Sequence, residues 1–112
     1  MNNIKLGEIG EQAAAELLAH KGYSILKRNY RCKTGEIDII VQRNSELSFV
    51  EVKTRQNRNY GRPCEAVTAD KAEHIRKTAY CYLQELKKHG YSPQKISFDI
   101  IEINIEHIKS AF

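Results

Sequence analysis

The first 21 residues place apolar side chains at helical intervals. These positions lie three or four residues apart, as one face of an α-helix requires: Leu6, Ile9, Ala13 and Leu17. Gly22 follows at a point where helices commonly end. The pattern therefore predicts a helix over residues 3–21.

Three shorter segments have the composition of β-strands. Residues 23–30 are mixed in polarity, whereas residues 36–42 and 47–55 are rich in branched apolar side chains. The polar residues 43–46 between the last two segments are typical of a turn. We therefore expect one strand followed by a β-hairpin.

The second half of the chain begins with a loop. Residues 56–64 contain Asn, Gly and Pro, and Thr68 after them is suited to cap a helix. An apolar stripe at helical spacing then continues to a basic stop signal at residues 87–90. Residues 96–105 predict a fourth strand, and residues 106–112 a short tail or a helical turn.

The predicted order of elements is α-β-β-β-α-β. Consecutive antiparallel strands followed by a helical crossover give a mixed sheet flanked by helices. The chain has 112 residues, enough for one hydrophobic core. We therefore expect a single α/β domain over residues 1–112.

Composition narrows the class of protein. The longest unbroken apolar run, residues 79–83, is far shorter than the ~20 residues of a membrane-spanning helix. The N-terminus lacks the features of a signal peptide, so we expect a cytoplasmic protein with no membrane partner. The three cysteines show no metal or disulfide spacing, and we interpret them as reduced structural residues.

Positive charge is concentrated in the middle of the chain. The whole sequence has 18 basic and 14 acidic residues, whereas residues 21–62 alone have ten basic residues against four acidic ones. A local excess of this kind is typical of proteins that contact phosphates, and it points to a nucleic acid. An ordinary solvated surface is the alternative.

An acidic residue interrupts the most apolar of the predicted strands. Asp38 stands between Ile37 and Ile39 in a segment that is apolar on both faces. A buried carboxylate is costly unless it is paired or binds a metal ion. Asp38 is therefore a candidate functional residue.

The following strand carries two more charged residues on one face. Alternation places Glu51 and Lys53 on one face, with Val50 and Val52 on the other, and two positions along a strand span ~6.6 Å. If the hairpin sets Asp38 beside this face, two carboxylates and an ammonium group converge within reach of one hard cation.

This set of residues suits hydrolysis of a phosphodiester. Asp38 and Glu51 offer the oxygen ligands that Mg²⁺ prefers, with Mn²⁺ as a second candidate, and the cation would activate a water and neutralise the phosphate. Lys53 could orient the water or stabilise charge at phosphorus. The alternative is a charge pair on an exposed strand and an acid at a turn.

On these residues the chain resembles the PD-(D/E)xK, or restriction-endonuclease-like, nuclease superfamily. Within it, the chain is similar to the bacterial YraN-type family, a relative of archaeal Holliday-junction resolvases. The resemblance covers nearly the whole chain. One position departs from the superfamily's pattern: the residue before Asp38 is Ile37, where the pattern has proline. The matching positions are Gly7 with Glu11, Gly22-Tyr23, Asn29-Tyr30-Arg31, Gly35-Glu36-Ile37-Asp38, Phe49 to Arg55, Ala66-Val67-Thr68 with Lys71, and Phe98-Asp99.

The resemblance implies roles for four of these residues. It implies a metal site at Asp38 and Glu51, with Lys53 as a catalytic residue. Glu11 matches the helix-one glutamate that such proteins bring to the metal or its waters, although a solvated helical glutamate is the alternative. The resemblance also implies a restriction-endonuclease-like arrangement of the single domain, and the likeness to resolvases implies a homodimer.

Basic residues near the Asp38 strand are candidates for contacts with DNA phosphates. They are Lys27, Arg28, Arg31, Lys33 and Arg55, with Arg58 and Arg62 in the loop that follows. Lys71, near the start of the second predicted helix, could bind a phosphate at the helix N-terminus. Ordinary surface residues are the alternative for each of them.

Together these features predict an Mg²⁺-dependent DNA endonuclease that favours branched or single-stranded DNA. Two alternatives stay open on the same fold. One is a nucleic-acid-binding module that does not cut. The other is a subunit that is active only with a protein partner.

Overall fold

The computed structural model of the protein describes residues 3–56 and 67–112 and contains the predicted elements in the predicted order. They are α1 (Asn3–His20), β1 (Ser24–Cys32), β2 (Gly35–Arg43), β3 (Glu46–Arg55), α2 (Ala69–Lys88) and β4 (Lys95–Asn104). From residue 57 onward, the predicted loop lies outside the described residues, and so do Arg58, Arg62, Cys64 and Ala66.

The four strands form one mixed sheet in the order β1-β2-β3-β4. β1 pairs with β2, and β2 with β3, in the antiparallel sense. β4 runs parallel to β3, because the connection between them contains α2 and returns the chain to the same end of the sheet. The predicted single α/β domain with a mixed sheet is confirmed.

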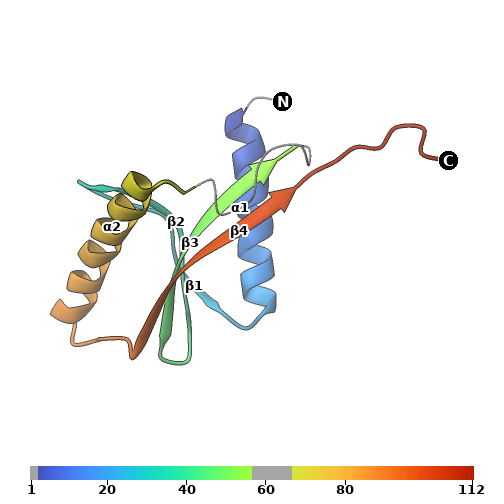
Figure 1. Ribbon diagram of the computed structural model, residues 1–112. Helices are drawn as coiled ribbons and strands as arrows, with labels where there is room; N and C mark the ends of the chain where they lie inside the picture. The colour runs from blue at the N-terminus through green and yellow to red at the C-terminus, as the bar shows by residue number, and fades with distance from the viewer. Residues whose placement is uncertain (1–2, 57–66) are drawn as a thin grey trace.

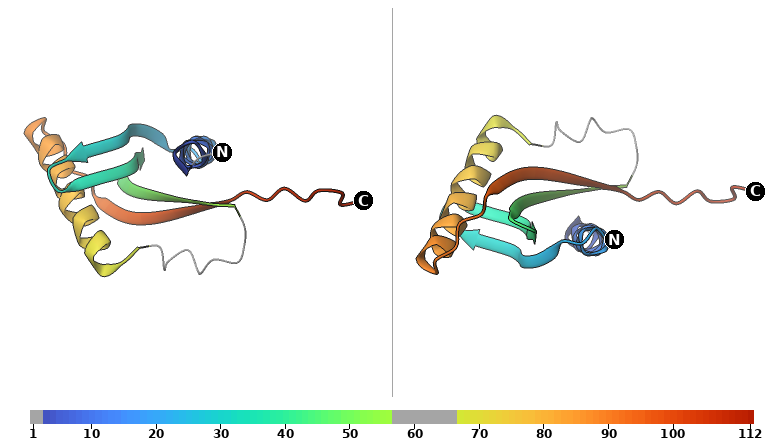
Figure 2. Two further views of the ribbon diagram at one scale, coloured as in Figure 1. Left: turned by 90° about the horizontal axis from the view of Figure 1, so that it is seen from above. Right: turned by 90° about the horizontal axis from the view of Figure 1, so that it is seen from below.

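The two helices cover opposite faces of the sheet (Figures 1 and 2). Alternate strand residues therefore enter different cores. The core beneath α2 contains Ile37, Ile40, Leu47, Phe49, Ile75, Ala79 and Tyr82. The core beneath α1 contains Ala14, Ala15, Leu18, Ile39, Val41 and Val50.

The face of α1 that packs on the sheet is not the apolar stripe of the sequence. Ala14 and Leu18 are buried, whereas Ile9 and Leu17 of the predicted stripe are 45% and 41% exposed. Small residues bring the helix close to the strands. A Cβ atom at Gly10 would overlap the side chain of Thr54 and lie 2.9 Å from its Cβ, so only glycine fits there without movement.

Helix α2 begins and ends as the sequence predicts. Thr68 caps its first turn by accepting a hydrogen bond from the main-chain nitrogen of Lys71 at 3.2 Å. His89 occupies the C-cap, and Gly90 follows with a φ of 82°. Because this cap fixes the first turn, it also fixes the position of Lys71 over the sheet.

The last residues of the chain extend away from the sheet (Figure 1). The main-chain nitrogen of Ile105 donates to the carbonyl oxygen of Arg55 at 2.8 Å, and beyond this bond the segment has no helix or strand. Residues 106–112 are thus a tail, one of the two outcomes expected for them. Within residues 3–56 and 67–112, neither helix is long and apolar enough to span a membrane.

Candidate active site

The regular pairing of the central strands is interrupted at Asp38. On one side, β2 pairs with β3 only as far as Ile39 opposite Val50. On the other side, Asn29 of β1 adopts a left-handed conformation, with a φ of 53°, next to the pairing of Tyr30 with Ile37. The interruption leaves main-chain groups near Asp38 without their usual ladder partners.

Side-chain carboxylates replace the missing main-chain acceptors. The nitrogen of Val52 donates to Asp38 Oδ2 at 2.7 Å, and the nitrogen of Asp38 donates to Glu51 Oε1 at 3.5 Å. The Asp38 carboxylate therefore accepts a hydrogen bond from β3, which carries Glu51, and the Glu51 carboxylate accepts one from β2, which carries Asp38. The hairpin brings Asp38 and Glu51 together, as the sequence predicts.

Lys71 supplies the positive charge next to this pair. Its Nζ atom lies 3.6 Å from Glu51 Oε2, and the Glu51 side chain is 11% exposed. The Thr68 cap holds Lys71 in place in the first turn of α2. The residue that the sequence suggested as a phosphate ligand is thus a direct neighbour of a proposed metal ligand.

The carboxylates open into a cavity of about 570 Å³, which we call the acidic cavity. It is bounded by the β1–β2 turn, by β2 and β3, and by the first two turns of α2. Its lining consists of Thr34, Gly35, Glu36, Asp38, Glu51, Thr68, Asp70, Lys71, His74 and Ile75. Polar groups from three elements therefore converge on one space.

Burial makes both carboxyl groups harder to ionise. Burial first, and then the charge of Asp38, raises the pKa of Glu51 to about 7, although Lys71 opposes the shift. Burial also raises the pKa of Asp38, against the hydrogen bond from Val52 and the charge of Lys71. At neutral pH the cavity holds negative charge that a cation would stabilise.

Glu11 extends the acidic group towards α1. Burial raises the pKa of Glu11, and the charge of Asp38 adds to the shift, so the two carboxyl groups interact. With its amide nitrogen turned towards them, Asn29 bridges Glu11 Oε1 at 3.0 Å and Glu36 Oε1 at 3.2 Å. Glu11 is thus linked to the site through Asn29 and through its charge, although it does not line the acidic cavity.

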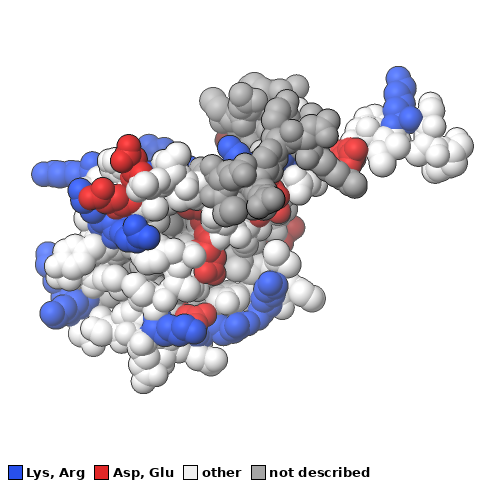
Figure 3. Space-filling model, viewed as in Figure 1, with Lys and Arg blue, Asp and Glu red and all other residues white. Residues whose placement is uncertain are grey.

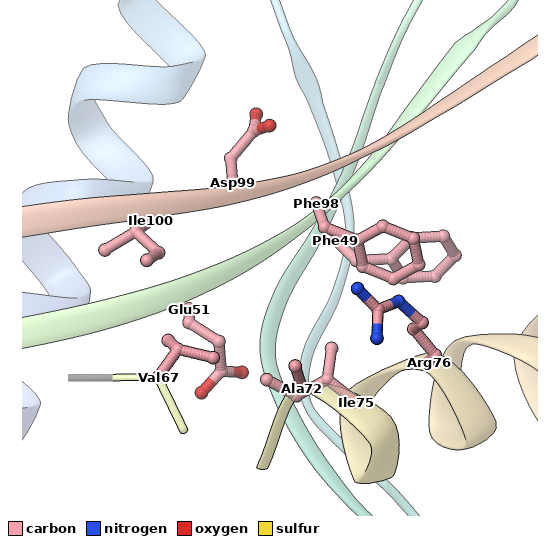
Figure 4. Close-up of a pocket in the computed structure, with 9 residues that line it drawn as sticks. All are labelled: Phe49, Glu51, Val67, Ala72, Ile75, Arg76, Phe98, Asp99 and Ile100. Carbon is pink, nitrogen blue, oxygen red and sulfur yellow. The ribbon is translucent and has the colours of Figure 1, made fainter. Parts of the chain in front are cut away.

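A smaller apolar groove adjoins the acidic cavity and shares Glu51 and Ile75 with it. Its volume is about 190 Å³. Figure 4 shows the Glu51 carboxylate pointing towards Val67 and Ala72 at the start of α2, whereas the rings of Phe49 and Phe98 overlap farther along the groove, near Arg76. These rings are stacked with centroids 5.4 Å apart. The acid pair therefore lies at the border between a polar and an apolar wall.

Two β3 residues of the predicted site do not line the acidic cavity. Lys53 is exposed and does not line the acidic cavity, and no ion pair joins it to the described residues. Arg55, predicted to bind DNA, is only 10% exposed, and its Nε lies 2.6 Å from Glu102 Oε1. This ion pair gives Arg55 a structural role between β3 and β4.

The other predicted phosphate ligands lie in β1 and in the turn after it. Lys27, Arg28, Arg31 and Lys33 are all exposed. Arg28 donates to Gln12 Oε1 at 2.8 Å, and Arg31 Nε lies 3.4 Å from Glu36 Oε2. Figure 3 shows Lys and Arg side chains along the margins of one face, with acidic side chains between them.

Sequence reasoning gave no role to Glu36, His74 or Asn29. Glu36 was the easiest to find, because alternation places it two positions before Asp38 on the same strand. His74 lines the cavity one helical turn after Asp70. Histidines are common in helices, and the spacing of His74 from the other histidines does not indicate a metal site. Asn29 depends on an irregular strand that no periodic pattern reveals.

The chemistry of the donor set suits a divalent cation. Asp38 and Glu51 offer hard oxygen atoms in one cavity, and Mg²⁺ commonly binds through one or two carboxylates while it keeps several waters. Within the described part of the chain, no three His, Cys, Asp or Glu side chains form a ready metal cage. The pair fits Mg²⁺ shared with a phosphate better than a fully protein-bound ion.

Comparison with known proteins shows extensive similarity to one family. A profile described as the uncharacterised protein family UPF0102 matches residues 10–103. A UPF0102 protein of Symbiobacterium thermophilum is 50% identical over 99 residues, which cover 88% of this chain and 81% of the relative. A UPF0102 protein of Clostridioides difficile is 43% identical over 117 aligned positions, covering all of both chains.

Proposed function

The chain belongs to the uncharacterised protein family UPF0102, and from the geometry of its own site we propose that it is a metal-dependent DNA endonuclease. The observation that carries this proposal is the contact between Asp38 and Glu51 in a cavity that also contains Lys71. Asp38 and Glu51 on the central strands, with Lys53 two positions after Glu51, also fit the pattern of the PD-(D/E)xK superfamily.

Asp38 and Glu51 would hold the cation. A bound Mg²⁺ supplies positive charge beside the scissile phosphate and makes a nearby water easier to deprotonate. Lys71 favours the charged form of Glu51, because its ammonium group opposes the rise in pKa that burial causes. Glu11 and Glu36 add negative charge at the α1 side of the site and attract the cation.

Lys53 is the proposed catalytic ammonium group. It lies two positions after Glu51 on the same face of β3, and its exposed side chain is free to reach a phosphate on the surface. Stabilisation of the charge that develops at phosphorus then requires no movement of the strands. The exposed residues Lys27, Arg28, Arg31 and Lys33 are proposed to bind the DNA backbone.

The test is cleavage of a panel of single-stranded, duplex, flap and four-way DNA with Mg²⁺, with Mn²⁺ and with a chelator. We expect metal-dependent cleavage, fastest on branched or single-stranded DNA, that Asp38→Asn abolishes. Glu73→Gln is the control, because Glu73 is exposed on α2, pairs with Lys77 and does not line the acidic cavity. Metal-dependent binding without any cleavage would contradict the proposal and favour a non-cleaving module or a partner-dependent subunit.

The two lysines are distinguished by their response to metal concentration. Lys53→Ala should lower cleavage at saturating DNA by about 100-fold or more at every Mg²⁺ concentration, since charge stabilisation in the transition state is lost. Lys71→Ala should raise the pKa of Glu51, and high Mg²⁺ should restore the rate. Lys77→Ala, an exposed lysine on the same helix, is the control. Identical metal dependence of both variants would contradict this division of roles.

A further inference from the structure

Two cysteines face each other between β1 and α2. Cys32 is the last residue of β1, Cys81 lies in α2, and their sulfur atoms are 3.0 Å apart. Both thiols are free and half-buried. The 49 positions that separate the two residues in sequence make this contact a product of the fold.

The two sulfur atoms are already in direct contact. Disulfide sulfurs lie about 2.0 Å apart, so the two atoms need to approach by only about 1 Å. We propose that Cys32 and Cys81 form a reversible disulfide when the protein meets hydrogen peroxide or a related peroxide. This modification site is independent of the proposed nuclease function.

The surroundings of Cys32 favour its reaction as a thiolate. Thr34 Oγ1 lies 3.0 Å from Cys32 Sγ, and its hydroxyl group can rotate to donate to the sulfur. Thr34 Oγ1 also lies 2.9 Å from Thr78 Oγ1, whose hydroxyl group donates to the carbonyl oxygen of His74 at 2.8 Å. Burial raises the pKa of Cys32, but hydrogen bonds from Cys81, Thr34 and Thr78 outweigh it and lower the pKa to about 7. The bond to Cys32 raises the pKa of Cys81, so Cys32 ionises first.

The oxidation proceeds in two steps. The Cys32 thiolate attacks one peroxide oxygen, the O–O bond breaks, and Cys32 becomes a sulfenic acid, while the departing hydroxide takes up the proton that the thiol released and leaves as water. The sulfur of Cys81 then attacks the sulfenic sulfur and expels a second water. Two thiols and one hydrogen peroxide thus give one disulfide and two waters, and a dithiol reductant reverses the change.

The disulfide would join two walls of the acidic cavity. Thr34 and Gly35, which follow Cys32, line this cavity, as do Lys71 and His74 of α2. A covalent link between β1 and α2 also restricts the unfolded chain, because it closes a loop of 49 positions. We therefore expect the oxidised protein to melt at a higher temperature, by roughly 5–15 °C.

The experiment uses intact-mass spectrometry of single variants of the full chain after treatment with hydrogen peroxide. Cys64→Ser retains the proposed pair, whereas Cys32→Ser and Cys81→Ser each retain one member with Cys64. Only Cys64→Ser should lose the mass of two hydrogen atoms as a monomer, and dithiothreitol should restore them. Melting of each reduced variant checks that it is folded.

Three results would overturn the proposal. In the first, Cys64→Ser keeps two free thiols or gains oxygen atoms without losing two hydrogens. In the second, it links to another molecule. In the third, the variants that lack Cys32 or Cys81 form an internal disulfide equally well. A melting temperature that oxidation leaves unchanged would contradict the predicted link between β1 and α2.

Discussion

The carboxyl group of Glu51 is an acid in a place that disfavours its charge. The residue is 9% exposed, and its pKa is raised from 4.5 to about 7 by burial and by Asp38. The side chain has hydrogen-bonding and ionic partners, but these compensate only part of the cost of removing the charge from water. Glu51 in its charged form thus lowers the stability of the folded protein, as is common for charged residues at sites that bind a ligand.

This cost predicts a pH dependence of stability in the metal-free protein. Glu51 has a higher pKa when folded than when unfolded, so the folded state binds more protons between about pH 4.5 and about pH 7. The free energy of unfolding should therefore fall as the pH rises through this range, by on the order of 3 kcal/mol from Glu51. Urea denaturation with a chelator present measures the effect.

Two variants identify the source of this dependence. Glu51→Gln should flatten the decrease, whereas Glu73→Gln, at an exposed position on α2, should leave it unchanged. Mg²⁺ should raise stability at pH 8 in the parent protein and not in Glu51→Gln, because a ligand that binds only the folded state stabilises it. Equal pH dependence in all three proteins would show that Glu51 ionises normally.

Helix α1 shows how one small residue fixes the position of an element. Gly10 lies against Thr54 of β3, whereas a Cβ atom at Gly7, one turn earlier on the same helix, would meet no atom within 4 Å. The two glycines lie on the same helix, but only Gly10 is in contact with the sheet. Comparing substitutions at the two positions therefore measures how much the close contact between α1 and β3 contributes to stability.

Substitution of each glycine by alanine should have opposite effects. Gly10→Ala should lower the free energy of unfolding by about 1–3 kcal/mol, because the new methyl group overlaps Thr54. Gly7→Ala should raise it by roughly 0.5–1 kcal/mol through the better helix propensity of alanine. Thermal or urea unfolding measures both changes, and Thr54→Ala should partly rescue Gly10→Ala. Equal effects of the two substitutions would argue against a tight contact.

The elements of the fold were predictable to a greater extent than the contacts between them. The Ile-rich strand around Asp38 and the alternation around Glu51 sufficed to predict their meeting, because a hairpin leaves few other arrangements. The apolar stripe predicts the helix α1 but does not mark its packed face, because close approach favours Gly10 and Ala14 over the larger Ile9 and Leu17. The positions of the large apolar side chains alone therefore do not reveal which face of a helix packs on a sheet.

Lys71 illustrates a contact that only the tertiary structure reveals. It is separated from Glu51 by 20 positions that include residues outside the described part of the chain. Its helix position follows from the Thr68 cap, but the direction in which α2 crosses the sheet does not follow from any local pattern. Sequence reasoning therefore identified the lysine without its partner.

At the scale of the whole molecule, the exposed basic residues predict salt-dependent binding of DNA. Removing one contact to a phosphate should make the slope of log affinity against log salt shallower by about 0.9 for duplex DNA. The double variant Arg31→Glu, Lys33→Glu should therefore lower affinity for all sequences alike and reduce the slope by about two units. Titrations of DNA at several salt concentrations measure both the affinity and the slope.

The control changes the same charge elsewhere on the molecule. Lys87 and Lys88 lie in the last turn of α2, roughly 24 Å along the helix from Lys71. Lys87→Glu, Lys88→Glu should leave the slope nearly unchanged if the DNA lies over β1 and the acidic cavity. Equal decreases of affinity in both double variants would indicate a general effect of net charge, without a defined binding surface.

The outer edge of β4 affects how the protein behaves in concentrated solution. Among the described strands, β4 has a neighbour on one side only, and Ile96, Phe98 and Ile100 on it are between 37% and 45% exposed. An edge with free main-chain groups and apolar side chains is a template on which another chain can add a strand. Its ten residues exceed the short length with which many proteins blunt such an edge. Aggregation of the stored protein, seen as the onset of turbidity, should thus begin at this strand under conditions in which the core is still folded.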